Sequence, residues 1–304
     1  MSDTGAAKGG LMNIGEEAKP PFAVLPDPSN IFLKRSRRFT SLAPGHELEA
    51  YLLFLADLTG AQHEIRSQLP VAELPPPAQI AQALANGMPP LTPEYLANGG
   101  AVEVVHLLLA EVAKRKIPEQ TAAAIKELEA APPEVLAKAL EDALDFDAPA
   151  ADVAQRVLLT AALQVHAARL ATQLDVDSLQ PIADGICPAC GHPPAASAVV
   201  GWPKAHNSRF CMCSLCGTHW NVVRVKCVLC SETGGITYQT IEGQSDAVKA
   251  ETCSKCRRYV KINYQVHHPD LEAFADDVAT LGLDLLMREG GWLRGGRNLF
   301  LLGL

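Results

Sequence analysis

The sequence has 304 residues, 48% of them hydrophobic and 20% charged, with a net charge of −8 and a pI of about 5.6. This length and composition are typical of a globular protein with two domains, and the acidic balance argues against general nucleic-acid binding. The charge is unevenly distributed. Residues 185–268 hold nine Lys and Arg against four Asp and Glu, which makes this segment +5 and the remainder −13.

The N-terminal segment, residues 1–24, is rich in Gly and Pro and is expected to be a flexible tail. It lacks the apolar core of a signal peptide, and no apolar run in the chain reaches the roughly 18 residues that span a bilayer. We therefore expect a cytoplasmic protein without membrane insertion. Clustered cysteines in that compartment are typical of metal binding or redox chemistry rather than disulfides.

Residues 25–180 have a helical pattern. Apolar residues recur at helical spacing in HELEAYLLFLADL and in AVEVVHLLLAEVAKRK. Farther along, Pro132 ends one predicted helix and Pro133 begins the next, and the longest predicted helix starts at Asp152. We expect an α-helical domain here. Its basic run, LKRSRR, is expected to be a solvated face, with contact to a partner as the alternative.

From Gly185 the pattern changes to short strand-like runs between turn residues. The clearest is RRYVKINYQV, residues 257–266, in which alternate residues fall on opposite faces of a strand. Helical periodicity returns after Pro269, in DLEAFADDVATLGLDLLMREGG. The segment between Gly185 and Pro269 is therefore predicted to be β-rich and to be followed by a helix.

All nine cysteines lie in this β-rich segment, and eight of them form a repeat. The pattern C-x2-C-x22-C-x2-C occurs twice, forty residues apart, as Cys187, Cys190, Cys213 and Cys216 and then as Cys227, Cys230, Cys253 and Cys256. Each C-x-x-C turn directs two thiolates at an ion about 2.3 Å away, and two turns complete a tetrahedron. Four sulfur ligands suit either iron or zinc. We predict two metal sites of the rubredoxin or zinc-ribbon type.

The predicted fold class is α+β, with an α-helical N-terminal domain, two tandem rubredoxin-like or zinc-ribbon β modules and a C-terminal helix. The expected boundaries are a tail at 1–24, the helical domain at 25–180, the first module at 181–226, the second module at 227–268 and a C-terminal helical segment at 269–304.

The two modules differ in the residue that follows each second cysteine. Gly191 and Gly217 occupy this position in the first module, whereas Ser231 and Arg257 occupy it in the second. Such turns often need a positive φ, which glycine adopts most easily. Our hypothesis is that the second site is more strained and more labile than the first.

Cys211 is outside the repeat, since its counterpart forty residues later is Glu251. Two interpretations stay open for it: a spare thiol for redox exchange, or a partly buried strand residue. The chain has no P-loop, no G-x-S-x-G and no paired-carboxylate motif, so we predict no enzyme activity and no catalytic residues. The glycine-rich WLRGGRN near the C-terminus is a weak signal of a turn.

Taken together, these residues resemble the bacterial formate dehydrogenase accessory proteins of the FdhE type. The resemblance runs from LPDP (Leu25–Pro28) and RSRRFTSLAPGHELEAYLLFLADLTGAQ through the four C-x-x-C pairs to FADDVATLGLDLLMREGGWLRGGRN. It implies a cytoplasmic protein that binds the catalytic subunit of respiratory formate dehydrogenase before export and helps to assemble it. It also implies rubredoxin-like folds, redox-active thiols and iron at both sites, with zinc as the alternative.

Two other functions remain open at this point. A rubredoxin-like electron carrier would use both metal sites but would leave the helical residues without a role. A zinc-ribbon nucleic-acid-binding protein would conflict with the net charge of −8, so we expect no nucleic-acid partner. The sequence indicates no particular oligomeric state.

Overall fold

A computed structural model describes residues 20–98, 100–145 and 152–301 of the chain. Most of the predicted tail, residues 1–19, lies outside the described residues. Its end, Ala23–Val24, forms strand β1. The helical part contains α1 (Ile31–Leu42), α2 (Glu49–Ile65), α3 (Pro77–Ala85), α4 (Pro93–Ala97), α5 (Ala101–Val112), α6 (Glu119–Ala130), α7 (Pro133–Leu144) and α8 (Val153–Ala171), with short 3-10 turns at Arg66–Gln68 and Val176–Ser178.

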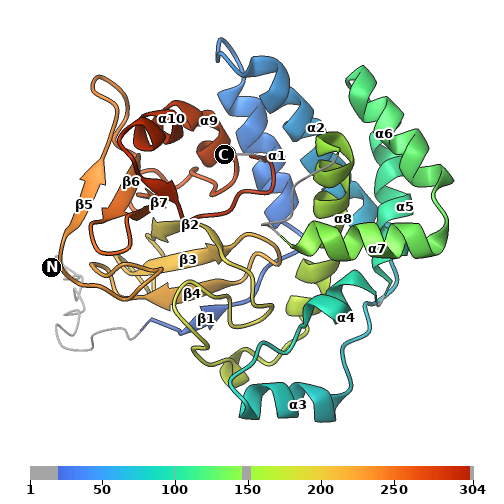
Figure 1. The fold of residues 1–304 in the computed structure, drawn as a ribbon, viewed down its shortest axis with the longest axis horizontal. Coiled ribbons are helices and arrows are strands. Elements are labelled where there is room, and N and C mark those ends of the chain that lie inside the picture. The colour runs from blue at the N-terminus through green and yellow to red at the C-terminus, as the bar shows by residue number, and fades with distance from the viewer. Residues whose placement is uncertain (1–19, 99, 146–151, 302–304) are drawn as a thin grey trace, which may run out of the picture.

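Helix α8 is the centre of this helical domain. It begins at Val153, where the side chain of Asp152 accepts a hydrogen bond from the Gln155 amide at 2.8 Å. Nearly all its residues are buried, and it packs against α2, α5, α6 and α7 (Figure 1). As predicted, Pro133 is the first residue of α7, where its missing N–H costs no helical hydrogen bond. Among the described helices, none combines the length and apolarity that crossing a membrane requires.

His166 on α8 is expected to make the stability of the protein dependent on pH. It is 1% exposed, and neither ring nitrogen has a hydrogen-bond partner among the described residues. Burial, together with the nearby charge of Arg169, lowers its pKa to about 4. An unfolded histidine binds a proton near pH 6.5, so between pH 6.5 and 4 the unfolded state binds more protons than the folded state. His166 alone should therefore lower the free energy of unfolding by about 2–3 kcal/mol over that interval.

Urea unfolding at several pH values would check this expectation. The variant His166→Gln should show a flatter pH dependence than the wild type, because it removes the buried titrating group. The matched variant His106→Gln changes an exposed histidine of α5 and should keep the full wild-type slope. Equal slopes for His166→Gln and the wild type would contradict the assignment to His166.

The two predicted cysteine modules share one continuous sheet (Figure 1). Antiparallel strands β2, β3 and β4 belong to the first module, and antiparallel β5, β6 and β7 belong to the second. A parallel pairing of β2 with β7, in which Ser197 lies opposite Ile262, joins them. The strands are β2 (Pro194–Val199), β3 (Arg209–Cys213), β4 (His219–Val222), β5 (Ile236–Gln239), β6 (Val248–Cys253) and β7 (Arg258–Asn263), in the order β1-β4-β3-β2-β7-β6-β5.

The C-terminal segment packs back onto the second module. Instead of a single helix it forms two short helices, α9 (Ala275–Ala279) and α10 (Leu281–Glu289), followed by strand β8 (Leu293–Arg294). Strand β8 pairs in parallel with β7, and α9 contacts α1 and α2 of the helical domain (Figure 1). The α+β class with a helical N-terminal region, a β-rich region and C-terminal helices is confirmed.

A buried network of charges attaches α9, α10 and β8 to strand β7. Lys261, which is 2% exposed, places its Nζ 2.6 Å from Asp284 Oδ2 and 3.0 Å from Asp277 Oδ1. The Arg294 guanidinium contacts the same two carboxylates, and the Tyr259 hydroxyl donates to Asp284 Oδ1 at 2.7 Å. Two positive and two negative side chains thus balance each other away from water. The face of β7 that carries Tyr259 and Lys261 therefore points into the protein rather than toward solvent.

A second set of buried contacts joins α1 to the C-terminal segment. The Arg35 guanidinium lies 3.1 Å from Glu272 Oε1 and stacks 3.7 Å from the centre of the Phe274 ring. Arg38 forms two hydrogen bonds with the Asp276 carboxylate. The expectation of a solvated face for LKRSRR is therefore wrong for these two arginines, because their carboxylate partners come from a segment more than 230 residues away.

Candidate metal centres

The first group of cysteines has the geometry of a tetrahedral sulfur site. Cys187 and Cys190 lie in the loop before β2, Cys213 ends β3 and Cys216 lies in the following turn. The Sγ atoms of Cys187 and Cys216 are 3.7 Å apart, and those of Cys190 and Cys213 are 3.4 Å apart. Four sulfurs about 2.3 Å from one ion would be about 3.8 Å apart. The group therefore fits a four-coordinate metal.

The second group repeats this arrangement forty residues later. The Sγ atoms of Cys227 and Cys256 are 3.8 Å apart, and those of Cys230 and Cys253 are 3.7 Å apart. Cys253 ends β6 as Cys213 ends β3. Within each group all four sulfurs lie within 4.8 Å of one another. The structure thus gathers the eight cysteines of the sequence repeat into the two groups that their spacing predicts.

The same tight turn carries each C-x-x-C pair. The residue after the second cysteine has a positive φ in all four turns, as expected, with values of 78° at Gly191, 76° at Gly217, 62° at Ser231 and 57° at Arg257. At Gly217 a Cβ would also lie 2.5 Å from Ile31 Cδ1, so any larger residue there would require the Ile31 side chain to shift. The two non-glycine residues of the second module adopt a backbone conformation that is unfavourable for side-chain-bearing residues.

The two groups differ in access to solvent. Every cysteine of the first group is at most 1% exposed, whereas Cys230 and Cys256 of the second are half-buried. The helical domain covers the first group: the Leu91 amide donates to Ala189 O at 3.1 Å, and Gln164 Nε2 on α8 donates to Ser214 O at 3.0 Å. Each of these contacts reaches the inside of a C-x-x-C turn.

Full ionisation of the first group needs a cation. Burial raises the pKa of Cys187 and of Cys190 well above the usual value of a thiol. Burial also opposes ionisation of Cys216, but hydrogen bonds with the other thiols and with Thr218 lower the pKa of Cys216 overall. One negative charge can therefore be shared within the group. A metal ion would stabilise the further thiolates that full coordination requires.

Cys211 belongs to neither group. It lies in the middle of β3, opposite Ser197 and Trp220, and is completely buried. Burial raises the pKa of its thiol to about 12, so the thiol stays protonated and unreactive at neutral pH. Of the two interpretations, the structure supports a buried strand residue. Its counterpart Glu251 instead accepts a hydrogen bond from the buried Arg209 guanidinium at 2.8 Å.

Comparison with known proteins gives matches along nearly the whole described chain. Three family models match: the FdhE N-terminal domain over residues 20–184, the FdhE central domain over 186–224 and the FdhE C-terminal domain over 225–301. The chain belongs to the FdhE family. The match to the FdhE C-terminal domain includes both the second module and the segment that follows it. In this chain the pairing of β8 with β7 and the Lys261 network hold these two parts together.

Individual FdhE proteins are similar over nearly the whole chain. A protein FdhE homolog of Rhizobium meliloti (strain 1021) is 41% identical, covering 95% of this chain and 96% of its own length. A protein FdhE homolog of Edwardsiella ictaluri (strain 93-146) is 36% identical, covering 91% of this chain and 90% of its own. The crystal structure of the FdhE protein from Pseudomonas aeruginosa superposes with a TM-score of 0.81 at 30% identity, over 93% of this chain and 99% of that one.

Proposed function

We propose that this FdhE protein is an accessory factor in the assembly of formate dehydrogenase, and that it binds the enzyme's catalytic subunit in the cytoplasm before export. The observation that carries the proposal is the match of all three FdhE domains over residues 20–301, with both four-cysteine groups formed. On this proposal the protein acts by binding rather than as an enzyme. Its net charge of −8 argues against a nucleic-acid partner.

Iron is our first candidate for both sites and zinc the second. Four thiolates leave a net charge of −1 around Fe(III) and −2 around Zn(II), so two loaded sites reduce the +5 segment to +3 or +1. Bound iron would add one-electron redox chemistry that zinc lacks. In either case the eight cysteines hold the turns of the two modules together, and the half-buried Cys230 and Cys256 are the thiolates through which a redox reaction would reach solvent.

An electron carrier is the second candidate function, and the exposure of Cys230 and Cys256 favours it. A carrier needs a metal close to the surface, and the second group would hold one there. The helical domain weighs against this candidate, because its buried contacts with Ala189 and Ser214 enclose the first group completely.

Capture of a client under anaerobic conditions tests the proposal. Tagged protein is used as bait in cells that express a respiratory formate dehydrogenase, and an untagged strain is the control. We expect the catalytic subunit to be recovered before export and without its membrane partners. Failure to recover it, together with reversible oxidation of two irons in the purified protein, would favour the electron carrier instead.

A further inference from the structure

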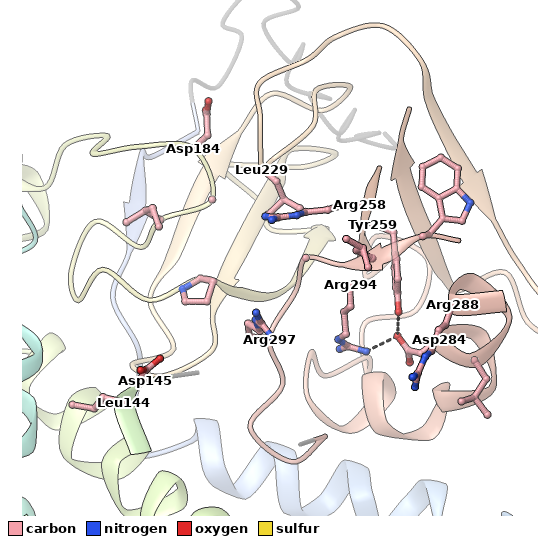
Figure 2. A pocket seen from close by; sticks show the side chains of 17 residues that line it. Leu144, Asp145, Asp184, Leu229, Arg258, Tyr259, Asp284, Arg288, Arg294 and Arg297 are labelled. Carbon is pink, nitrogen blue, oxygen red and sulfur yellow. Dashed lines mark hydrogen bonds and ion pairs between the residues drawn. The ribbon is translucent and has the colours of Figure 1, made fainter. Parts of the chain in front are cut away.

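A cavity of about 810 Å³ lies where both cysteine modules, the C-terminal segment and the end of α7 meet (Figure 2). Leu229, inside the third C-x-x-C turn, forms one wall, and Pro193, shortly after the first turn, lines another part of the cavity. Much of the rest comes from WLRGGRN, the glycine-rich motif to which no role has yet been assigned. Close packing requires its glycines, since a Cβ on Gly296 would lie 2.6 Å from Ala195 O.

Four arginines and three aspartates line this cavity, and their pairing leaves two positive charges uncompensated. Asp284 forms ion pairs with Lys261 and Arg294, and Asp184 Oδ1 lies 3.7 Å from Lys226 Nζ. Asp145 and Arg297 are also partnered. By contrast, the exposed side chains of Arg258 and Arg288 make no ion pair or hydrogen bond with another residue of the described chain.

Apolar side chains line the same cavity as these two arginines. Leu285 is 48% exposed and Leu293 is 64% exposed, and both line the cavity together with Trp292. Leu286, 49% exposed, follows Leu285 on α10. Exposed leucines grouped around a hollow are typical of interaction sites. The cavity therefore combines the two features of a peptide-binding surface, an apolar contact area and guanidinium groups free to bind carboxylates.

We propose that this arginine cavity is the docking site for a segment of a partner polypeptide in which acidic and apolar side chains are adjacent. Carboxylates of the segment bind Arg258 and Arg288, and its apolar side chains contact Leu285, Trp292 and Leu293. A free small anion is a poorer occupant, because an exposed arginine holds one only weakly in water and the leucines would stay uncovered. Identification of the partner as the formate dehydrogenase subunit rests on the proposed function; the docking site itself does not.

The charge of the protein makes this site selective. Outside residues 185–268 the chain carries −13, so an acidic segment is repelled from most of the remaining surface. Because Arg258 and Leu229 belong to the second module, bound polypeptide would lie beside the more exposed metal group.

The test compares the double variant Arg258→Glu/Arg288→Glu with the control Lys116→Glu/Lys126→Glu. The control makes the same change in net charge at exposed lysines of the helical domain. The probe is a fluorescein-labelled octapeptide of alternating Glu and Leu, followed by anisotropy at low salt. We expect the wild type and the control to bind it at least about tenfold more tightly than the double variant. Equal binding by all three proteins, equal binding of a Lys-Leu peptide, or displacement by millimolar inorganic phosphate would overturn the proposal.

Capture of the catalytic subunit with the same variants separates this proposal from the proposed function. Loss of capture in the double variant alone, with metal content and melting temperature unchanged, supports docking at the cavity. Undiminished capture by the double variant overturns it and leaves the accessory role intact. Peptide binding that depends on the arginines, with no capture by any of the proteins, supports the cavity and contradicts the accessory role.

Discussion

A chelator should remove metal from this protein in two separate phases, and the second cysteine group should lose its metal first. The first group is at most 1% exposed and is covered by α8 and by the segment before α4, whereas Cys230 and Cys256 can be reached by solvent. We expect the two rates to differ by at least about tenfold, which corresponds to about 1.4 kcal/mol in the activation barrier. The measurement is a time course of metal release into a chromogenic chelator in excess.

Two variants would show which cysteine group releases its metal in each phase. Cys230→Ser should abolish the fast phase and preserve the slow one, because only the second group loses a ligand. Ser231→Gly should slow the fast phase, since glycine relieves the positive φ of 62° without removing any ligand. Release of both metals at one rate, or a fast phase that survives Cys230→Ser, would show that the difference in burial does not control metal loss.

Replacing Lys261 with methionine should destabilise the protein by about 3–5 kcal/mol. The side chain is 2% exposed and contacts both Asp277 and Asp284. Its removal leaves two buried carboxylates whose remaining cationic partner, among the described residues, is Arg294. Methionine preserves most of the volume, which makes the lost charge the main cause. Chemical denaturation of the metal-loaded protein measures the change.

Lys249→Met is the matched control on the neighbouring strand β6. Lys249 pairs with Asp246, which is 77% exposed, and a pair so open to water contributes about 0–1 kcal/mol. A loss of less than about 1 kcal/mol in this variant, next to the large loss in Lys261→Met, would locate the effect in the buried network. Similar losses in the two variants would contradict the importance of that network.

The metal-release and denaturation experiments test different parts of the β-rich region. The Lys261 network holds the C-terminal segment against β7, which is the element that joins the second module to β2 of the first. The arginine cavity lies at the same junction, and Arg294 belongs both to the network and to the cavity wall. Lys261→Met should therefore also weaken binding at the cavity, whereas Lys249→Met should not.

The sequence by itself determined the two metal groups and the division into a helical and a β-rich part. Thiol coordination depends on local spacing, so C-x-x-C turns twenty-two residues apart are sufficient to predict which eight cysteines come together. The start of α7 was also predictable from local sequence, because proline suits the first helical position and Pro133 occupies it. The positive φ at Ser231 and Arg257 followed from the equivalence of the four turns.

Only the tertiary structure decided how these parts are used. Whether Lys261, Arg35 and Arg38 face water or carboxylates depends on residues 272–284, which approach them only in the folded chain. The same is true of the merging of two modules into one sheet, the burial of Cys211, and the meeting of Arg258 with WLRGGRN at one cavity. Contacts between segments distant in sequence leave no periodic signal, because each partner is compatible with an exposed position until the other is brought beside it.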